Sequence, residues 1–337
     1  MKIKVILLIL VSAITLSSCS KDPDGPKQPK PINLPQKGQQ VISASNRFGI
    51  DLFRVTAGEE NGNMMLSPLS ASTALTMLLN GCQSETYNQI RDMLGYGELT
   101  TQEINETYNS LVGQLLAVDP EVKLSLANAV WYKQGFNVKQ DFLSVMDSSF
   151  QAAIGALDFS QPSALETINN WAKDNTNGKI PKVLDEIDPD MVMFLMNALY
   201  FKGNWTYQFK ESQTSDLPFT LKDGSITDVK MMRQMLPARY FYGNNALAVE
   251  LPYGQQNFAM VIILPNENLD AYIVNFGEAG WQEIVEGLDS YAEPDDIEMI
   301  LPKFKFEYEK ILNDQLKALG MTDAFDPFLA DLSGIAD

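Results

Sequence analysis

One segment of eleven residues, MVMFLMNALYF at positions 191–201, constrains the fold of this chain more than any other. It is apolar throughout except for Asn197. Successive side chains of a β-strand point to opposite faces of the sheet, so a strand that is apolar on both faces must be covered on both. The segment therefore predicts a strand in the middle of a sheet, with a layer of the protein above it and another below.

Asn197 is the only side chain in this segment with strong polar requirements. A buried amide that lacks hydrogen-bond partners costs about 1–3 kcal/mol, and buried polar groups in folded proteins are almost always paired. We therefore expect a specific cluster of polar side chains around Asn197.

The rest of the chain divides into a helix-rich first part and a strand-rich second part. Ser67 stands where a helix N-cap is expected, and Pro68 occupies the favoured first helical position. Periodicity and terminating residues predict helices at 41–55, from 68 to near 80–81, and at 84–93, 100–116, 138–146, 164–175 and 311–319. Strand patterns occur at 64–66, 124–132, 246–251 and 258–264, and in the two halves of 296–308 on either side of Pro302. This order favours a single α+β domain over a regularly alternating parallel fold.

Composition excludes several classes of function. The 337 residues carry a formal net charge of −18, which opposes nucleic-acid binding because phosphates require an excess of Lys and Arg on some face. The chain contains no His, the usual base of Ser and Cys nucleophiles and a frequent zinc ligand. We expect no catalytic residues, no metal and no cofactor, and the carboxylate pairs Glu59/Glu60, Asp188/Asp190 and Asp295/Asp296 are interpreted as solvated loop charge.

The first forty residues have the pattern of an export signal followed by a linker. Lys2 and Lys4 precede an apolar core at 5–16 that is too short to span a bilayer, and LSSC at 16–19 closes the segment. This ending resembles a lipobox, which implies a signal peptide at 1–18, acylation of Cys19 and anchoring of an exported protein in the bilayer of the outer membrane or cell surface. The alternative is an ordinary secretory leader that ends at a Cys by chance.

Residues 19–40 are rich in Pro, which favours an extended and semi-rigid tether. If Cys19 is acylated, Cys82 is the only remaining thiol, so the chain can form no internal disulfide. Cys82 follows an apolar stretch, and we interpret it as a buried core residue because a catalytic Cys normally needs a His.

Several short segments occur in the order found in one protein family. They are NMMLSPLS at 63–70, INNW at 168–171 with TNGKI at 176–180, NALYFKGNW at 197–205, ELPY at 250–253 with MVIILP at 260–265, LPKF at 301–304, and LGMTDAF at 319–325. Together they resemble the serpin family of protease inhibitors, and the resemblance extends over residues 41–337.

The resemblance implies a monomeric fold of three β-sheets and eight or nine helices, whose partner is a protease of the serine class or sometimes the cysteine class. In inhibitory members a cleaved reactive loop enters the central sheet as an added strand and carries the protease with it. Ser67, Ser70 and Asn197 resemble the shutter cluster, beneath the point where that sheet opens. Trp205 resembles the breach tryptophan, at the end of the sheet where insertion begins.

The sequence departs from the family at its C-terminus. A serpin continues beyond a segment like FLADLS at 328–333 into another strand, a hinge, the reactive loop and the final strands, whereas this chain stops at Asp337. We therefore expect the chain as given to be incomplete, lacking the reactive bond, and the predicted inhibitory function refers to the complete form. The alternatives are a non-inhibitory binding protein with the serpin fold and a fragment without function.

Overall fold

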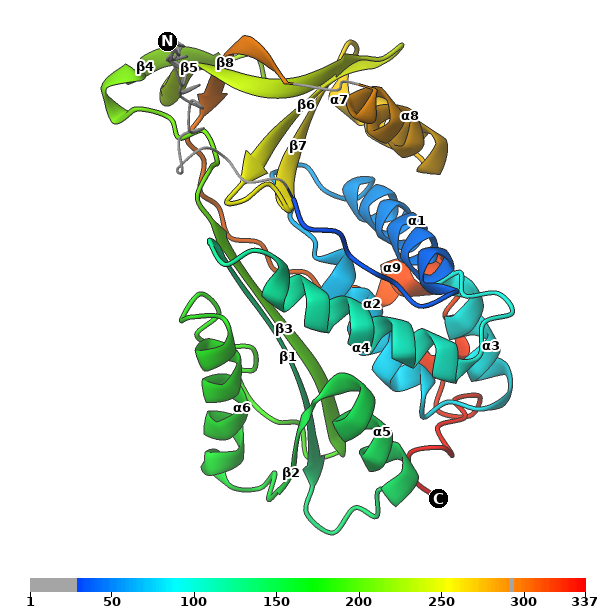
Figure 1. The fold of residues 1–337 in the computed structure, drawn as a ribbon. Helices are drawn as coiled ribbons and strands as arrows, with labels where there is room; N and C mark the ends of the chain where they lie inside the picture. The colour runs from blue at the N-terminus through cyan, green and yellow to red at the C-terminus, as the bar shows by residue number, and fades with distance from the viewer. Residues whose placement is uncertain (1–28, 291–293) are drawn as a thin grey trace, which may run out of the picture.

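The computed structural model describes residues 29–290 and 294–337 and shows a mixed α+β architecture (Figure 1). Within these ranges the chain forms nine α-helices, in agreement with the predicted eight or nine. They are α1 (Gly38–Ala57), α2 (Pro68–Leu79), α3 (Ser84–Met93), α4 (Thr101–Val118), α5 (Gln140–Phe150), α6 (Pro162–Asn175), α7 (Leu269–Asn275), α8 (Glu278–Asp289) and α9 (Asn313–Ala318).

The strands of the described ranges form two separate sheets. They are β1 (Val122–Lys133), β2 (Ala153–Leu157), β3 (Met193–Gly203), β4 (Thr214–Thr220), β5 (Ile226–Tyr242), β6 (Ala246–Tyr253), β7 (Phe258–Pro265) and β8 (Asp295–Pro302).

Local chemistry sets the helix boundaries. The Ser67 hydroxyl accepts a hydrogen bond from the Ser70 amide at the start of α2, as predicted for a helix cap. Thr100 and Glu103 form a reciprocal capping box at the start of α4.

The first sheet has the strand order β2-β1-β3. β1 and β3 are antiparallel and pair from Val122 opposite Gly203 to Tyr132 opposite Met193, while β1 and β2 are parallel. Helix α6 lies on one side of this sheet, and α2 and α4 lie on the other (Figure 1). The expectation that the 191–201 segment is covered on both faces is therefore confirmed.

The second sheet is built around β5, a strand of 17 residues. The first part of β5 pairs with β4 and β8, and its last residues, 239–242, pair with β6, which in turn pairs with β7. The two halves of this second sheet correspond to two of the three sheets that the family resemblance implies. Helix α8 packs on β5 and β6, where the ring of Phe241 fills the space that a side chain at Gly287 would need.

Two apolar clusters hold the first half of the molecule together. One lies between α1, α2 and α3 and includes Phe48, Leu52 and Ile90, all buried. The other lies between the first sheet and α4 and α5, and it also contains Ile335 from the C-terminal segment. Burying an aliphatic side chain contributes about 1.5–3 kcal/mol, so the C-terminal segment adds to the stability of this core through Ile335.

The structure corrects three details of the sequence prediction. Residues 64–66 and 303–308 form no strand. In the described ranges β3 lies at an edge of its sheet, because it pairs with β1 alone and β1 occupies the middle. An apolar run reports that both faces of a strand are covered, but it carries no information about neighbours along the hydrogen-bonding edges.

No helix in the described residues has the length and hydropathy needed to cross a membrane. Cys19 and the predicted signal peptide lie outside the described residues.

Candidate functional site

The polar partner of Asn197 is Asn128, which stands directly opposite it in the β1–β3 ladder. The Asn197 Nδ2 group donates to Asn128 Oδ1 at 2.8 Å. Asn128 is buried, and its own Nδ2 group donates to the Tyr108 hydroxyl at 3.1 Å and to the Phe150 carbonyl at 2.7 Å. A continuous set of hydrogen bonds therefore joins β3 through β1 to α4 and α5.

Asn128 and Tyr108 were not predicted from the sequence. Asn128 is the single amide side chain of β1, as Asn197 is of β3, and both are followed by Ala in otherwise apolar runs. Two isolated amides in two buried strands are the signal that could have paired them, because each requires a partner that an apolar core does not otherwise supply.

One atom of this group is left without a partner. Asn197 Oδ1 is buried and accepts no hydrogen bond within the described part of the chain. An unpaired buried acceptor costs about 1–3 kcal/mol, so this oxygen is a position at which an additional donor would stabilise the protein.

Ser67 and Ser70 lie at the start of α2, which packs against β3. The Ser67 hydroxyl donates to the Ser70 hydroxyl at 3.0 Å, and no hydrogen bond in the described residues links either serine to Asn197. The structure thus brings Asn197 together with Asn128 and Tyr108, and it places the two serines on the neighbouring helix as a separate pair.

Trp205 follows the end of β3 and connects the two sheets. Its backbone forms an isolated antiparallel bridge with Tyr253 of β6, and the two rings stack with centroids 4.3 Å apart and an interplanar angle of 13°. The indole also packs against Phe209 and belongs to the apolar cluster that includes Leu236 and Leu251.

Asp119 fixes the turn between β6 and β7 beside Trp205. Its carboxylate, nearly fully buried, accepts from the backbone amide of Gln255 at 2.7 Å and from that of Glu121 at 2.9 Å. Gly254 has φ of +48°, and a side chain there would lie 2.8 Å from Asp119 Oδ2. The sequence offered no periodic signal for the contact of Asp119 with this turn, because its distant partner there is a backbone amide.

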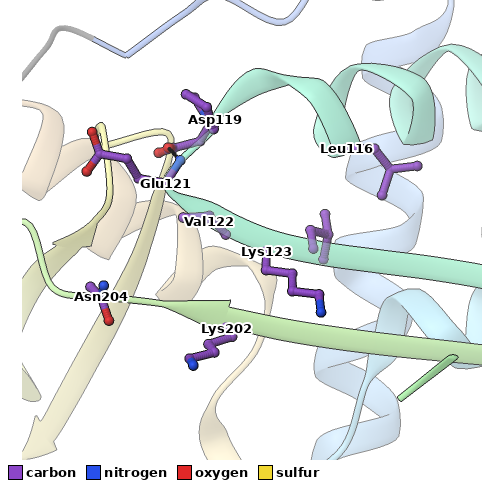
Figure 2. Close-up of a pocket in the computed structure, with 9 residues that line it drawn as sticks. Leu116, Asp119, Glu121, Val122, Lys123, Lys202 and Asn204 are labelled. Carbon is purple, nitrogen blue, oxygen red and sulfur yellow. Dashed lines mark hydrogen bonds between the residues drawn. The ribbon is translucent and has the colours of Figure 1, made fainter. Parts of the chain in front are cut away.

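An open hollow of about 520 Å³ lies beside this end of β3, where α4 ends and β1 begins (Figure 2). Lys123 and Lys202 stand opposite each other on β1 and β3, and Asp119 and Glu121 also line the hollow, so its charges balance. Its lining consists of Leu116, Asp119, Pro120, Glu121, Val122, Lys123, Leu124, Lys202 and Asn204. The described residues contain no group of His, Cys, Asp and Glu arranged to hold a metal ion.

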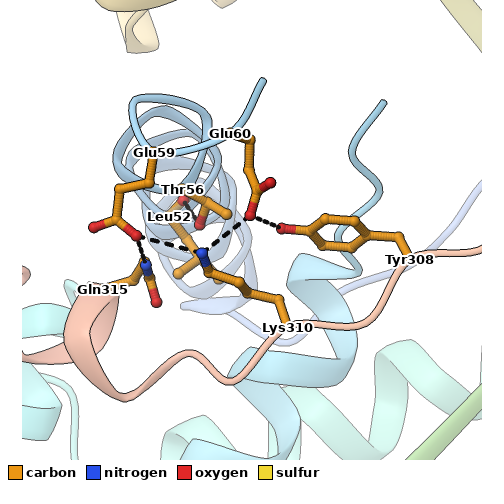
Figure 3. A network of polar contacts seen from close by, with 7 residues as sticks. All are labelled: Leu52, Thr56, Glu59, Glu60, Tyr308, Lys310 and Gln315. Atoms are coloured by element: carbon orange, nitrogen blue, oxygen red, sulfur yellow. Dashed lines mark hydrogen bonds and ion pairs between the residues drawn. The ribbon is translucent and has the colours of Figure 1, made fainter. Parts of the chain in front are cut away.

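A second polar network fastens the extended segment 303–310 to the end of α1 (Figure 3). The Lys310 ammonium donates to Glu60 Oε1 at 3.0 Å and to Glu59 Oε2 at 3.4 Å, and the Tyr308 hydroxyl donates to Glu60 at 3.0 Å. Gln315, 1% exposed, donates to Glu59 at 2.5 Å. The hydrogen bonds from Lys310 and Tyr308 hold the pKa of Glu60 below its usual value.

Cys82 is a core residue, as predicted. It is 1% exposed, its thiol donates to the Leu78 carbonyl at 3.2 Å, and burial together with the charge of Asp331 raises its pKa to about 12. A thiol with this pKa is almost entirely protonated at neutral pH and is a poor nucleophile.

Comparison with known proteins agrees with the fold. The family model described as serpin (serine protease inhibitor) matches residues 43–337. The chain is 34% identical to leukocyte elastase inhibitor of Xenopus tropicalis over 314 residues, covering 88% of this chain and 81% of the relative. It is 32% identical over 311 residues to leukocyte elastase inhibitor of Homo sapiens, with the same coverage of 88% and 81%.

Among solved structures, a thermophilic serpin, tengpin, in its latent state superposes with a TM-score of 0.81 at 31% identity, covering 90% of this chain and 81% of the other. The α+β architecture is thus that of a known class of protease-inhibitor fold. This chain belongs to the serpin family.

Proposed function

We propose that this protein inhibits an endopeptidase of the serine class by the trapping mechanism of its family, and that it does so as a lipoprotein anchored at the cell surface. In that mechanism a protease cleaves an exposed loop, and the loop then joins the first sheet as an additional strand. The serine class is proposed from the description of the family and from relatives named as elastase inhibitors.

The observation that carries the inhibitory proposal is the serpin fold itself, which the family model matches over residues 43–337 and which superposes on a solved serpin with a TM-score of 0.81. The family's mechanism adds a strand to the sheet that contains β3 through main-chain hydrogen bonds. In this chain eleven residues of β3 pair with β1 in one continuous ladder, so the sheet that would receive the added strand is formed.

The unpaired oxygen of Asn197 supports the same proposal. It lies near the middle of β3, so an added strand that supplies a donor at this level would relieve the cost of burying an unpaired acceptor. Trp205, whose ring stacks on that of Tyr253, resembles the tryptophan at the end of the sheet where insertion begins in the family.

The proposal of lipid anchoring rests on the sequence. Lys2, Lys4, the apolar core and the ending LSSC together have the pattern of a lipoprotein signal, and acyl chains on Cys19 would hold the protein at the bilayer of the outer membrane or cell surface.

The inhibitory proposal is tested with the natural protein, purified from its host and first weighed intact by mass spectrometry, so that its full length is known. It is then incubated with a panel of serine and cysteine endopeptidases. We expect a complex with at least one serine enzyme that survives denaturing electrophoresis and has the combined mass of inhibitor and protease, less the released peptide. Cleavage of the protein by every serine enzyme without such a complex would instead indicate the non-inhibitory alternative.

A further inference from the structure

The part of the predicted tether that the structure describes, residues 29–37, lies on the surface of the domain. It runs from the turn between β6 and β7 to the start of α1, and it is the dark blue segment of Figure 1. Helix α1 then begins at Gly38, three residues before the predicted start at residue 41.

The first attachment of this segment is made by Asn257, in the turn between β6 and β7. Its Oδ1 atom accepts from the backbone amide of Lys30 at 3.2 Å, and its Nδ2 group donates to the backbone carbonyl of the same residue at 2.8 Å. One side-chain amide therefore pairs with both polar groups of one residue, as a neighbouring β-strand would.

The second attachment repeats this arrangement on α4. Gln114 Oε1 accepts from the backbone amide of Asn33 at 2.7 Å, and Gln114 Nε2 donates to the Asn33 carbonyl at 2.7 Å. The same Nε2 group also contacts the Ser110 carbonyl and hydroxyl, one helical turn earlier, which holds the amide in position.

The end of the segment is fixed by charge and by close packing. The Lys37 ammonium lies 2.9 Å from the Glu103 carboxylate, and this ion pair, with hydrogen bonds from Thr100, lowers the pKa of Glu103 to about 2. The backbone turns sharply here, since the Gly38 amide donates to the Pro35 carbonyl at 2.8 Å and a side chain at Gly38 would collide with Leu34.

We propose that residues 29–37 form a fixed strap, clasped through their backbone by Asn257 and Gln114, and that this strap holds the β6–β7 turn of the domain toward the lipid bilayer. The second part rests on the proposed acylation of Cys19. From Cys19 to Lys30 a fully extended chain reaches about 40 Å, whereas an undocked chain from Cys19 to the start of α1 at Gly38 would reach about 65 Å. Docking therefore shortens the distance over which the domain can move from its anchor by roughly two fifths.

The strap also gives the domain an orientation. The β6–β7 turn lies next to the Trp205–Tyr253 bridge, at the Gly203 end of β3, so this end faces the membrane and the α5 end of the sheet faces away. A target protease would then act close to the lipid surface.

The strap itself is tested in solution, without lipid, on the mature chain carrying Cys19→Ala. Hydrogen–deuterium exchange is followed in the peptide that contains Lys30 and Asn33. We expect this peptide to exchange at least tenfold faster in the variant Gln114→Ala/Asn257→Ala than in the parent. Gln114→Glu keeps the acceptor for the Asn33 amide and loses the donor, so its exchange rate should lie between those of the parent and the double variant. Gln102→Ala/Asn266→Ala, which removes one amide from α4 and one from the loop after β7, should leave this exchange unchanged. Equal exchange in all four proteins would overturn the strap.

The orientation is tested on the acylated protein in vesicles of neutral phospholipid that carry an acceptor dye. A donor dye is placed at Lys202→Cys, near the β6–β7 turn, or at Ser144→Cys, on α5. We expect clearly stronger energy transfer from position 202, and a reduced difference between the two positions when Gln114 and Asn257 are both Ala. Equal transfer from the two positions in membrane-bound protein would overturn the orientation. Failure to bind vesicles would refute the proposed acylation and the orientation with it, while the exchange experiment still decides the strap.

Discussion

Asn197 and Asn128 face each other across the ladder of β3 and β1 and share a hydrogen bond of 2.8 Å between their side-chain amides. The two residues are not equivalent. Asn128 makes three side-chain hydrogen bonds and has no unpaired atom, whereas Asn197 makes one and keeps an unpaired buried oxygen. This asymmetry determines how the protein should respond when either is replaced.

Replacing Asn128 by Ala should lower the free energy of unfolding by about 2–4 kcal/mol, because it removes three buried hydrogen bonds, to the Phe150 carbonyl, the Tyr108 hydroxyl and the Asn197 amide. Urea denaturation of the two proteins measures the change. Asn109→Ala, next to Tyr108 but exposed, is the control and should change stability by less than about 0.5 kcal/mol. Equal effects of the two substitutions would show that the buried network contributes nothing specific.

Asn197→Ala should lower the free energy of unfolding by about 1 kcal/mol, less than Asn128→Ala. The substitution removes one hydrogen bond, but it also removes the unpaired oxygen. The melting temperature should fall only slightly. A larger loss at Asn197 than at Asn128 would mean that Asn197 Oδ1 has a partner in solution.

The network of Figure 3 should make stability depend on pH in a predictable direction. The pKa of Glu60 is lowered in the folded protein, so its ionised form stabilises the fold above the unfolded pKa of about 4.5, and this contribution is lost as the pH falls through the folded value. The difference in melting temperature between the natural protein and Glu60→Gln should be present at pH 7 and should shrink below pH 4.5. Glu211→Gln, in an exposed turn, controls for the change in net charge; a difference that stays constant with pH would contradict the assignment.

Cys19→Ala should move the protein from the membrane fraction to the soluble fraction when the gene is expressed in its own host, because the substituted chain offers no thiol for acylation. Fractionation followed by detection with an antibody measures this. Cys82→Ala is the matched control and should remain in the membrane fraction, since its thiol is buried in the core. If Cys19→Ala fractionates like the natural protein, the lipobox interpretation is wrong.

Much of the fold could be read from the sequence, because helix caps and apolar periodicity are local. Helix α3 was predicted at its observed bounds, and the cap at Ser67 is present as expected. Strand β5 was missed because its side chains alternate irregularly between buried and exposed positions along two different halves of a sheet. Helices α7 and α8 and the short strands β2 and β4 were also missed.

The candidate site was predictable only in part. The need of Asn197 for a partner followed from burial alone, but Asn128 lies 69 residues away, and pairing over that separation is set by the register of two strands. Asp119 could not be found because it binds the backbone of a turn more than a hundred residues distant, and main-chain partners leave no mark in the sequence.

Strand β5 is one uninterrupted backbone shared by the two halves of the second sheet, so these halves cannot tilt independently of each other. In the described ranges, the sole ladder contact between that sheet and the first one is the bridge from Trp205 to Tyr253. The rings of Tyr253 and Phe258 also contact Phe201 of β3, so the aromatic side chains of one corner couple the two sheets to each other.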